Sequence, residues 1–358
     1  MSLKLINACL SAGVGGEQVA FARYSSLLQD LGHNVITCVR HGAAITASLK
    51  PGCKVLALPS AFERDPRTVW RAAQVDSEFQ PDAIIAHSRR TFIAFAAMKT
   101  LFGRDTPLIR VVHRPSFKAV ERADRVICVS PGLAEQAARR CSDPSKVVYV
   151  PNFLDPVAKI PKQPRKSATP VIGFCGRFVP EKGIDLLLGA LRRLRAEGRE
   201  FRLVVAGDGP LRENLLASDD ARALAGCIEW RGWLADTAAF FSEIDVLVLP
   251  SRTEAFGLVT IEAFAAGTPV IATRTVGSTA LIRHELNGLL CDTSVEGIAA
   301  AIGRVLDDKA LLSRMGLQAE HDAAQYFTQS VASRLDRCLQ ETVRRSHGDA
   351  GGAVAAAG

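Results

Sequence analysis

The chain has 358 residues, a length typical of two ordinary domains rather than of one core. Hydrophobic residues make up 48% of it and charged residues 23%, which excludes a disordered or fibrous protein. The formal net charge of +7 is uneven, because residues 1–165 hold 23 Lys and Arg against 13 Asp and Glu, and the remainder holds 21 against 24.

This charge pattern and the cysteines limit the partners and the location. The basic first half is compatible with solvated helices or with an anionic partner, such as a lipid head group or a phosphorylated saccharide. Aromatic residues make up only 6% and do not alternate with a basic cluster, so nucleic acid is not an expected partner. No apolar run approaches the roughly twenty residues of a membrane span, and early glycines disfavour a signal peptide, so we expect a cytoplasmic protein. The nine scattered cysteines predict buried thiols rather than disulfides or a metal site.

Short apolar runs alternate with helical patterns along the first half of the chain. Residues 17–32 place apolar side chains on one helical face and end on Gly32, a typical helix terminator. Alternation of strand and helix favours a parallel sheet covered on both faces. The predicted strands are residues 4–10, 33–39, 54–59, 82–88, 108–113, 125–130 and 146–151.

Residues 155–170 interrupt the pattern with four prolines and four cations, which predicts an interdomain linker. The pattern then resumes with strands at 171–178, 201–209, 227–233, 245–251 and 268–273, and with helices at 183–198, 211–218, 237–244 and 258–267. The predicted fold class is therefore α/β, with two Rossmann-like doubly wound parallel sheets whose strand ends share a cleft. The small, polar residues 347–358 predict a disordered tail.

The sequence GRFVPEKG, residues 176–183, follows a predicted strand and opens a helix. It carries Arg177 at the strand end and Lys182 just before the helix. A guanidinium fork and an ammonium group near a helix N-terminus are suited to a diphosphate. The alternative is a pair of surface cations with no ligand.

The sequence SRTEAFGLVTIEAFAAG, residues 251–267, predicts a strand end, a turn and a helix. Phe256, Gly257 and Leu258 then lie at the helix start, where backbone N–H groups lack partners and glycine permits close approach. Glu254 lies on the turn and Glu262 about one turn into the helix. Carboxylates beside phosphate-binding amides are suited to hydroxyl groups, which a sugar nucleotide offers on both sides of its diphosphate. The alternative for Glu262 is a surface position on the helix.

Together these motifs resemble the retaining glycosyltransferases of the GT-B fold, in particular the fourth glycosyltransferase family (glycosyl transferases group 1). EAFGLVTIE matches the family's E-x7-E signature, GRFVPEKG its Arg and Lys motif, and VVAGDGPLRENL its second nucleotide-side loop. GVGGEQVA, LIRVVHR, ADRVICVS and VYVPNFLD match landmarks in the first half. The resemblance implies an acceptor-binding domain at 1–160, a nucleotide-sugar-binding domain at 161–325 and a helix at 326–346 that crosses back to the first domain.

The resemblance also implies roles for individual residues. Arg177 and Lys182 would hold the donor diphosphate without a metal, Glu254 a hydroxyl of the donor sugar, and Glu262 the ribose hydroxyls. His113 would lie beside the donor sugar, and His87 is a weaker candidate for acceptor contacts. The remaining nucleotide-sugar-binding positions are glycines or backbone groups, namely Gly15, Gly16, Gly207, Gly209, Phe256, Gly257 and Leu258.

The implied reaction is transfer of a sugar, with retention of configuration, from a UDP-, GDP- or ADP-linked donor to a saccharide or glycolipid acceptor. No cofactor beyond this donor substrate and no metal is expected. The basic first half and residues 89–104, which mix apolar and cationic positions, favour a lipopolysaccharide or polysaccharide intermediate and peripheral contact with the anionic inner face of the plasma membrane.

The sequence departs from the family pattern at Val276, which replaces a glycine, at Ala280, where a glutamate is common, and at Phe153 and Leu154. These departures leave the donor base, the sugar and the linkage open. Two other functions remain compatible with the sequence: a sugar-nucleotide isomerase or hydrolase on the same fold, and a catalytically silent binding protein. A nicotinamide dehydrogenase fits least, because the glycines after the first strand lack G-x-G-x-x-G spacing.

Overall fold

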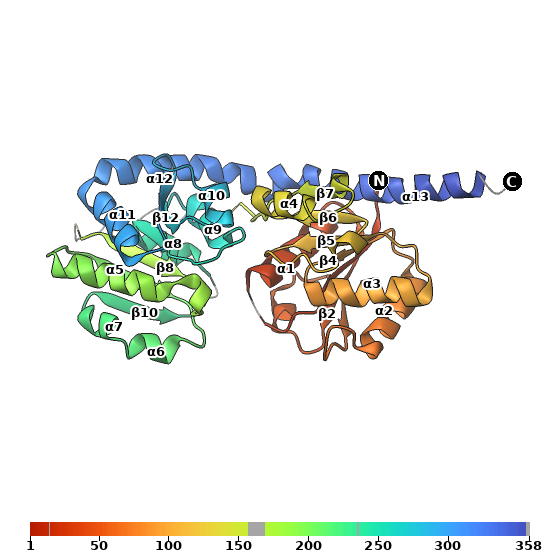
Figure 1. Cartoon of the computed structure of the whole chain (residues 1–358), viewed down its shortest axis with the longest axis horizontal. Coiled ribbons are helices and arrows are strands. Elements are labelled where there is room, and N and C mark those ends of the chain that lie inside the picture. Colours follow the sequence, from red (N-terminus) through yellow and green to blue (C-terminus); the bar gives the residue numbers. More distant parts are fainter. Residues whose placement is uncertain (14, 157–168, 235, 356–358) are drawn as a thin grey trace. The chain divides into compact units, whose positions relative to one another are not determined.

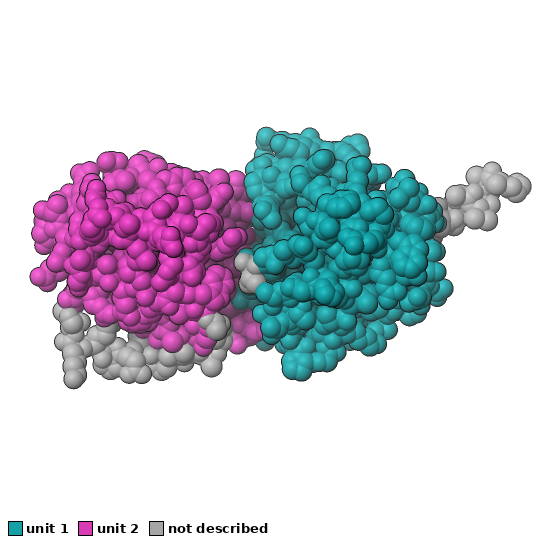
Figure 2. Space-filling view, turned by 90° about the horizontal axis from the view of Figure 1, so that it is seen from below, with its two compact units in different colours: residues 1–153, 328–358 teal, residues 154–327 magenta. Residues whose placement is uncertain are grey.

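The computed structural model describes residues 1–13, 15–156, 169–234 and 236–355, and side chains as far as residue 346. They form two compact units, of which unit 1 comprises residues 1–153 and 328–358 and unit 2 comprises residues 154–327 (Figure 2). Most of the predicted linker, and the predicted domain boundary at 160/161, lie outside the described residues.

Unit 1 contains a parallel sheet of seven strands in the order β3-β2-β1-β4-β5-β6-β7 (Figure 1). The order reverses between β1 and β4, so the switch point of this sheet lies between them. Its strands are β1 (Lys4–Cys9), β2 (Asn34–Arg40), β3 (Lys54–Leu58), β4 (Ala83–Ala86), β5 (Leu108–Val112), β6 (Arg125–Cys128) and β7 (Val147–Tyr149).

The helices of unit 1 are α1 (Gly16–Asp30), α2 (Pro66–Phe79), α3 (Arg89–Phe102), α4 (Pro131–Ala138) and α13 (Thr328–Ala355). Helix α13, far away in sequence, joins unit 1 through specific contacts. Its Glu341 accepts a hydrogen bond from buried Arg125 at 2.9 Å, and its Asp336 lies 3.2 Å from Nε2 of buried His33. The structure continues α13 to Ala355, within the range where the sequence predicts a disordered tail.

Unit 2 contains a parallel sheet of six strands in the order β10-β9-β8-β11-β12-β13, with its switch point between β8 and β11 (Figure 1). The strands are β8 (Val171–Cys175), β9 (Arg202–Ala206), β10 (Ile228–Gly232), β11 (Val246–Leu249), β12 (Val270–Thr273) and β13 (Gly288–Cys291). The helices are α5 (Ile184–Ala196), α6 (Arg212–Leu216), α7 (Asp219–Ala223), α8 (Ala238–Glu243), α9 (Leu258–Ala265), α10 (Val276–Leu281), α11 (Val295–Asp307) and α12 (Lys309–Ala323).

The two sheets confirm the predicted fold class of two doubly wound parallel domains. The twelve predicted strands all overlap observed ones, because parallel strands buried on both faces have short, continuous apolar sequences. Strand β13 was missed, since an apolar run of four residues is too short to distinguish a strand from a loop.

Regular apolar spacing produces the core of unit 2. In α5, Ile184, Leu187, Leu188, Leu191 and Leu194 are all buried, with the three- and four-residue spacing of one helical face. They belong to one hydrophobic cluster with buried residues of β8, β9 and α11. Burying each leucine contributes about 1.5–3 kcal/mol, so this face anchors α5 and fixes the loop that precedes it.

The chain passes between the units twice, at 153/154 and at 327/328, and these two segments are hydrogen-bonded neighbours. The backbone N–H of Leu154 donates to the carbonyl of Tyr326 at 3.0 Å, and Leu154 also forms an isolated β-bridge with Phe327. Among the described residues, no helix combines the length and the apolar character needed to cross a membrane.

Candidate active site

The predicted cations and carboxylates of unit 2 follow the two strands at its switch point. Arg177 and Lys182 follow β8, and Glu254 follows β11. Nζ of Lys182 lies 2.5 Å from Oε2 of Glu254, and both side chains are partly exposed. The structure therefore brings these two predicted site residues together as an ion pair, which the sequence analysis did not anticipate.

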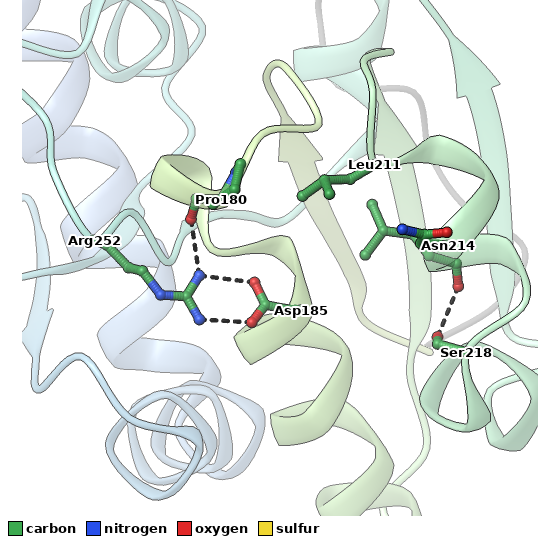
Figure 3. Close-up of a pocket in the computed structure, with 7 residues that line it drawn as sticks. Pro180, Asp185, Leu211, Asn214, Ser218 and Arg252 are labelled. Carbon is green, nitrogen blue, oxygen red and sulfur yellow. Dashed lines mark hydrogen bonds and ion pairs between the residues drawn. The ribbon is translucent and has the colours of Figure 1, made fainter.

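Arg252 locks the two loops that carry this ion pair. Its guanidinium donates to the carbonyl of Pro180 at 2.8 Å and, through two nitrogens, to the carboxylate of Asp185 at 2.8 and 2.6 Å (Figure 3). Its backbone N–H donates to the carbonyl of Glu181 at 2.8 Å. A two-pronged bond of this kind fixes both distance and orientation, so residues 180–185 and 250–254 form one rigid assembly.

Arg252 and Asp185 also line a pocket of about 350 Å³ together with residues of α6. Its lining comprises Pro180, Asp185, Leu211, Asn214, Leu215, Ser218 and Arg252. Figure 3 shows Leu211 and Asn214 on one side and the Arg252–Asp185 pair on the other. The predicted site residues do not line this pocket.

Gly183 makes the close approach of these loops possible. Its φ of +64° is a left-handed conformation, and a Cβ atom there would lie 2.0 Å from the carbonyl oxygen of Pro250. Glycine therefore meets a conformational and a steric requirement directly beside Lys182.

A second pair of loops positions Arg177. The N–H of Gly176 donates to Ala206 O at 3.0 Å, and the N–H of Phe178 donates to Asp208 O at 2.9 Å. Gly207 (φ +136°) allows this contact, since a Cβ atom there would lie 1.9 Å from the carbonyl oxygen of Gly176. The predicted glycines thus hold the loop that presents exposed Arg177, and a Cβ on Gly209 would likewise meet Phe178 backbone.

Helix α9 begins at Leu258, with Gly257 as its N-cap at φ +94°. No side chain caps this end, and the N–H of Thr260 donates to the carbonyl of Gly257 at 2.9 Å, which leaves the N–H groups of Leu258 and Val259 for an anion. The side chain of Phe256 is buried against Tyr326, with ring centroids 6.0 Å apart, so only the backbone of Phe256 is available to a ligand.

Helix α10 supports the Glu254 turn. The N–H of Gly277 donates to the carbonyl of Glu254 at 2.8 Å, and a Cβ on Gly277 would lie 2.6 Å from Phe256 N. Val276, where the family often has a glycine, is the first residue of α10, and Gly277 occupies the position that requires close packing.

Cys175, the last residue of β8, is a half-buried free thiol close to the charged residues. Burial and the charge of Glu262 together raise its pKa to about 12, against the opposing charge of Lys182. Glu262, partly exposed on α9, therefore lies near enough to the end of β8 to influence Cys175.

In unit 1 the predicted residues also gather at strand ends around the switch point. Gly15 caps the N-terminus of α1 and Gly16 is its first residue, without a side-chain cap. Glu17, which the sequence analysis did not single out, lies in the same turn. Its carboxylate accepts a hydrogen bond from Ser11 Oγ at 2.8 Å and lies 3.4 Å from Arg114, and burial raises its pKa.

His87 follows β4 and His113 follows β5, and their rings are in contact. Nδ1 of His87 lies 3.0 Å from Nε2 of His113, and the rings stack with centroids 5.2 Å apart. Burial lowers the pKa of His113 to about 3, helped by the charge of Arg114, and burial lowers the pKa of His87 well below its usual value. Both rings are therefore neutral at physiological pH.

Arg110 is a further residue that the sequence did not reveal. It lies buried in β5, 5.1 Å above the ring of Phe92, and it donates to the carbonyls of Ser116 and Lys118. Burial lowers its pKa to about 10. It anchors the loop that follows His113, and a single arginine inside an apolar strand gives no sequence signal for such a role.

No cluster of three or more His, Cys, Asp or Glu side chains suited to a metal ion occurs in the part of the chain that the structure describes. The arrangement offers cations, free helix amides and carboxylates in unit 2, and a neutral histidine pair in unit 1.

Two family models match the chain. One, described as Glycosyltransferase Family 4, matches residues 14–157, and the other, described as Glycosyl transferases group 1, matches residues 169–308. This chain is a group 1 glycosyltransferase. The family assignment confirms the resemblance drawn from the motifs, and the two sheets are the two domains of its GT-B fold.

Individual glycosyltransferases are similar to this one over most of its length. Lipopolysaccharide core biosynthesis glycosyltransferase LpsD of Rhizobium meliloti (strain 1021) is 29% identical over 312 residues, 84% of this chain and 88% of that protein. A GDP-mannose-dependent alpha-(1-6)-phosphatidylinositol monomannoside mannosyltransferase of Mycobacterium tuberculosis (strain CDC 1551 / Oshkosh) is 28% identical over 298 residues, 76% of this chain and 75% of that protein.

The fold is shared with solved structures. Anabaena Alr3699/HepE in complex with UDP and glucose superposes with a TM-score of 0.81, at 18% identity, over 95% of this chain and 100% of that one. At this level of identity the likeness establishes the GT-B fold alone.

Proposed function

We propose that this glycosyltransferase transfers a sugar, with retention of anomeric configuration, from a nucleoside-diphosphate sugar to a saccharide or glycolipid acceptor of the cell envelope. The observation that carries the proposal is the Lys182–Glu254 ion pair, which the Arg252 contacts fix beside the uncapped N-terminus of α9. The lipopolysaccharide core activity of LpsD supports the acceptor class.

In this proposal, cations and helix amides stabilise the leaving group. Arg177, Lys182 and the N–H groups at the start of α9 hold the diphosphate as the glycosidic C–O bond lengthens and negative charge develops. Glu254 accepts a hydrogen bond from a hydroxyl of the donor sugar. Its contact with Lys182 keeps both side chains in position before the donor binds. Glu262 accepts the ribose hydroxyls.

The acceptor hydroxyl attacks from the face that the diphosphate leaves, and a phosphate oxygen takes its proton. Gly15 and Gly16 leave room for the donor at the N-terminus of α1, and His113 contacts the donor sugar. The chemistry requires no metal, because fixed cations neutralise the leaving group.

The first test is a thermal-shift comparison of UDP, GDP, ADP and CMP with their sugar conjugates. One nucleoside diphosphate should raise the melting temperature of the wild type but not that of Arg177→Ala. Arg222→Ala, which removes an exposed arginine of α7, is the matched control and should keep the shift. If no nucleotide shifts the wild type at millimolar concentration, the donor assignment is wrong.

Transfer is then measured with the donor so identified. NMR of the product should give the same anomeric configuration as the donor, and EDTA should leave the rate unchanged. Inversion would refute the front-face mechanism, and release of free sugar at the full rate without acceptor would identify a hydrolase instead.

We also propose that unit 1 contacts the anionic surface of a membrane near the start of α2. Phe62 and Trp70 are each 57% exposed, and between them in the sequence lie exposed Arg64 and exposed Arg67, the latter in an ion pair with Asp65. Aromatic rings at the head-group level with adjacent cations favour an anionic bilayer. Vesicles with phosphatidylglycerol should bind the wild type more strongly than Trp70→Ala, whereas Trp233→Ala in unit 2, 54% exposed, should bind normally. Equal binding of all three proteins would refute this surface.

A further inference from the structure

Three segments follow the strands at and beside the switch point of unit 1, and together they carry an excess of positive charge. They are residues 10–16 after β1, residues 87–90 after β4 and residues 113–118 after β5. They contain no Asp or Glu, and their cations are Arg89, Arg90, Arg114 and Lys118. Because a doubly wound sheet binds its ligand outside the carboxyl ends of the strands at the switch point, a ligand of unit 1 meets these cations.

Two of the four cations are engaged in contacts within the protein. Arg89 forms an ion pair with Glu63, and Arg90 donates to two backbone carbonyls of the loop before α2. Lys118 is exposed and has no ion pair within the described ranges. The side chain of Arg114 is 70% exposed and belongs to the residue directly after His113. Arg114 is therefore the cation best placed to meet a ligand beside His113.

The backbone that carries Arg114 is held in place from below. Buried Arg110 of β5 donates to the carbonyls of Ser116 and Lys118, and the N–H of Ser116 donates to the carbonyl of Arg114 at 2.6 Å. The loop after β5 is thus fixed by one buried guanidinium, while the next guanidinium in the sequence faces solvent.

Glu17 orients the side chain of Arg114 without using up its donors. The carboxylate of Glu17 is only 10% exposed, and its Oε1 accepts a hydrogen bond from Ser11 Oγ at 2.8 Å. Its Oε2 lies 3.4 Å from Nη2 of Arg114, longer than the roughly 2.7–2.9 Å of a strong charge-assisted hydrogen bond. Burial raises the pKa of Glu17, which disfavours the negative charge that would oppose an anion here. Most N–H groups of Arg114 are therefore left for a ligand.

We propose that Arg114 binds an anionic group of the acceptor, a phosphate or a carboxylate, and makes the enzyme specific for acidic acceptors. This inference rests on the proposed function, which assigns the donor diphosphate to the cations of unit 2 and places His113 beside the donor sugar. A planar guanidinium with several free N–H groups is suited to either anion. Since consecutive Cα atoms are only about 3.8 Å apart, an anion held by Arg114 lies close to the sugar at His113.

The test compares one acceptor preparation with and without its anionic groups. Envelope glycolipids from cells that lack the gene are deacylated to give water-soluble saccharides. One portion stays intact, a second is treated with hydrofluoric acid, which removes phosphate esters, and in a third the carboxylates are reduced to alcohols. Transfer to each portion is measured with the nucleotide sugar that the thermal-shift comparison identifies.

The wild type should prefer the intact portion. We expect kcat/KM for the acceptor to fall about tenfold to 100-fold when the anion is removed, since hydrogen bonds to charged groups are the strong ones. The treatment that causes the fall identifies the anion as phosphate or as carboxylate.

Arg114→Gln should lose a similar factor with the intact portion and should no longer distinguish it from the portion without the anion. Arg114→Lys should keep part of the preference. Arg139→Gln is the matched control, because Arg139 is another arginine of unit 1 with a 73% exposed side chain and a single carboxylate partner, Glu135. It should show the preference of the wild type. The preference is a ratio of two rates from one protein sample, so partial unfolding of a variant does not change it.

Three results would overturn the proposal. They are a wild type that uses all portions equally, an Arg114→Gln enzyme that keeps the full preference, and loss of the nucleotide-dependent melting shift in Arg114→Gln, which would make Arg114 a donor contact. Acceptor binding is also measured without turnover, as the rise in melting temperature that each portion gives to nucleotide-saturated protein. Failure of the wild type to transfer sugar would therefore refute the proposed function separately.

Discussion

Each unit brings two candidate site residues together, but the pair is charged in unit 2 and neutral in unit 1. Unit 2 holds Lys182 and Glu254 as a partly exposed ion pair fixed by loop contacts. Unit 1 holds buried His87 and partly exposed His113 as a neutral pair, in which the ring of His87 packs against Tyr24 of α1. Both pairs follow adjacent strands near a switch point. The comparison shows that adjacent strand ends bring functional groups into the same region, whereas loop contacts and strand register decide how the groups meet. Burial then disfavours the charged form of the histidines.

The largest effect is expected when one charge is removed from the ion pair of unit 2. Lys182→Met should lower kcat by about 100-fold to 1,000-fold, because it removes a group that stabilises the departing diphosphate. Steady-state kinetics with the identified donor measure this. Lys99→Met removes a pair of similar geometry in unit 1, Lys99–Asp124 at 2.7 Å, and should leave kcat unchanged. A Lys182→Met enzyme with normal kcat would show that the pair is only structural.

Gly183 tests whether loop packing fixes the unit 2 pair. Gly183→Ala should destabilise the protein by about 3 kcal/mol or more, since left-handed strain adds to overlap with Pro250 O. Gly198→Ala, at φ +82° with no atom within 4 Å of the new Cβ, should cost only about 1–2 kcal/mol. Urea unfolding measures both changes. Equal losses would mean that the loop contact yields without strain.

The free energy of unfolding at acid pH tests whether the histidine pair of unit 1 is neutral. The pKa of His113 is lowered from 6.5 to about 3, so between these values the unfolded chain binds a proton that the folded chain excludes. Stability should therefore fall as the pH falls from about 6.5, by at most about 1.4 kcal/mol per pH unit for this group. The raised pKa of Glu17 acts in the opposite direction. Unfolding of His113→Asn should depend less steeply on pH between 6.5 and 5, and an unchanged slope would contradict the pKa.

Arg252 gives the smallest expected effect. Arg252→Gln breaks its bonds to Asp185 but leaves the catalytic pair intact, and an exposed ion pair contributes about 0–1 kcal/mol to stability. We expect kcat to fall less than in Lys182→Met, because Lys182 loses support but keeps its charge. A fall as large as that of Lys182→Met would make Arg252 a direct participant.

The sequence predicted the side chains that are recognisable by their charge and their spacing. Arg177, Lys182, Glu254 and Glu262 stand in a fixed order after strands, and the fold class followed from alternating apolar runs. The Arg252 contacts were not predictable, because they join positions about seventy residues apart. In addition, an arginine on a turn is normally expected to be a solvated cation.

The histidine pair was only half predictable. His113 and His87 each drew attention at a strand end, but their contact depends on the register of β4 against β5 and on the ring orientation set by α1. Glu17 gave no signal because its raised pKa comes from burial, which a single sequence does not reveal.

The Arg252 contacts and the Gly183 approach have a consequence for building hybrid enzymes. Residues 180–185 and 250–254 fit each other because Arg252 binds the Pro180 carbonyl and the Asp185 carboxylate, and because Gly183 has no side chain. A chimera whose junction falls between these segments inherits them from different parents, and a mismatch at either contact removes support from the loop that carries Lys182. Exchange of donor preference between relatives should therefore transfer both segments together.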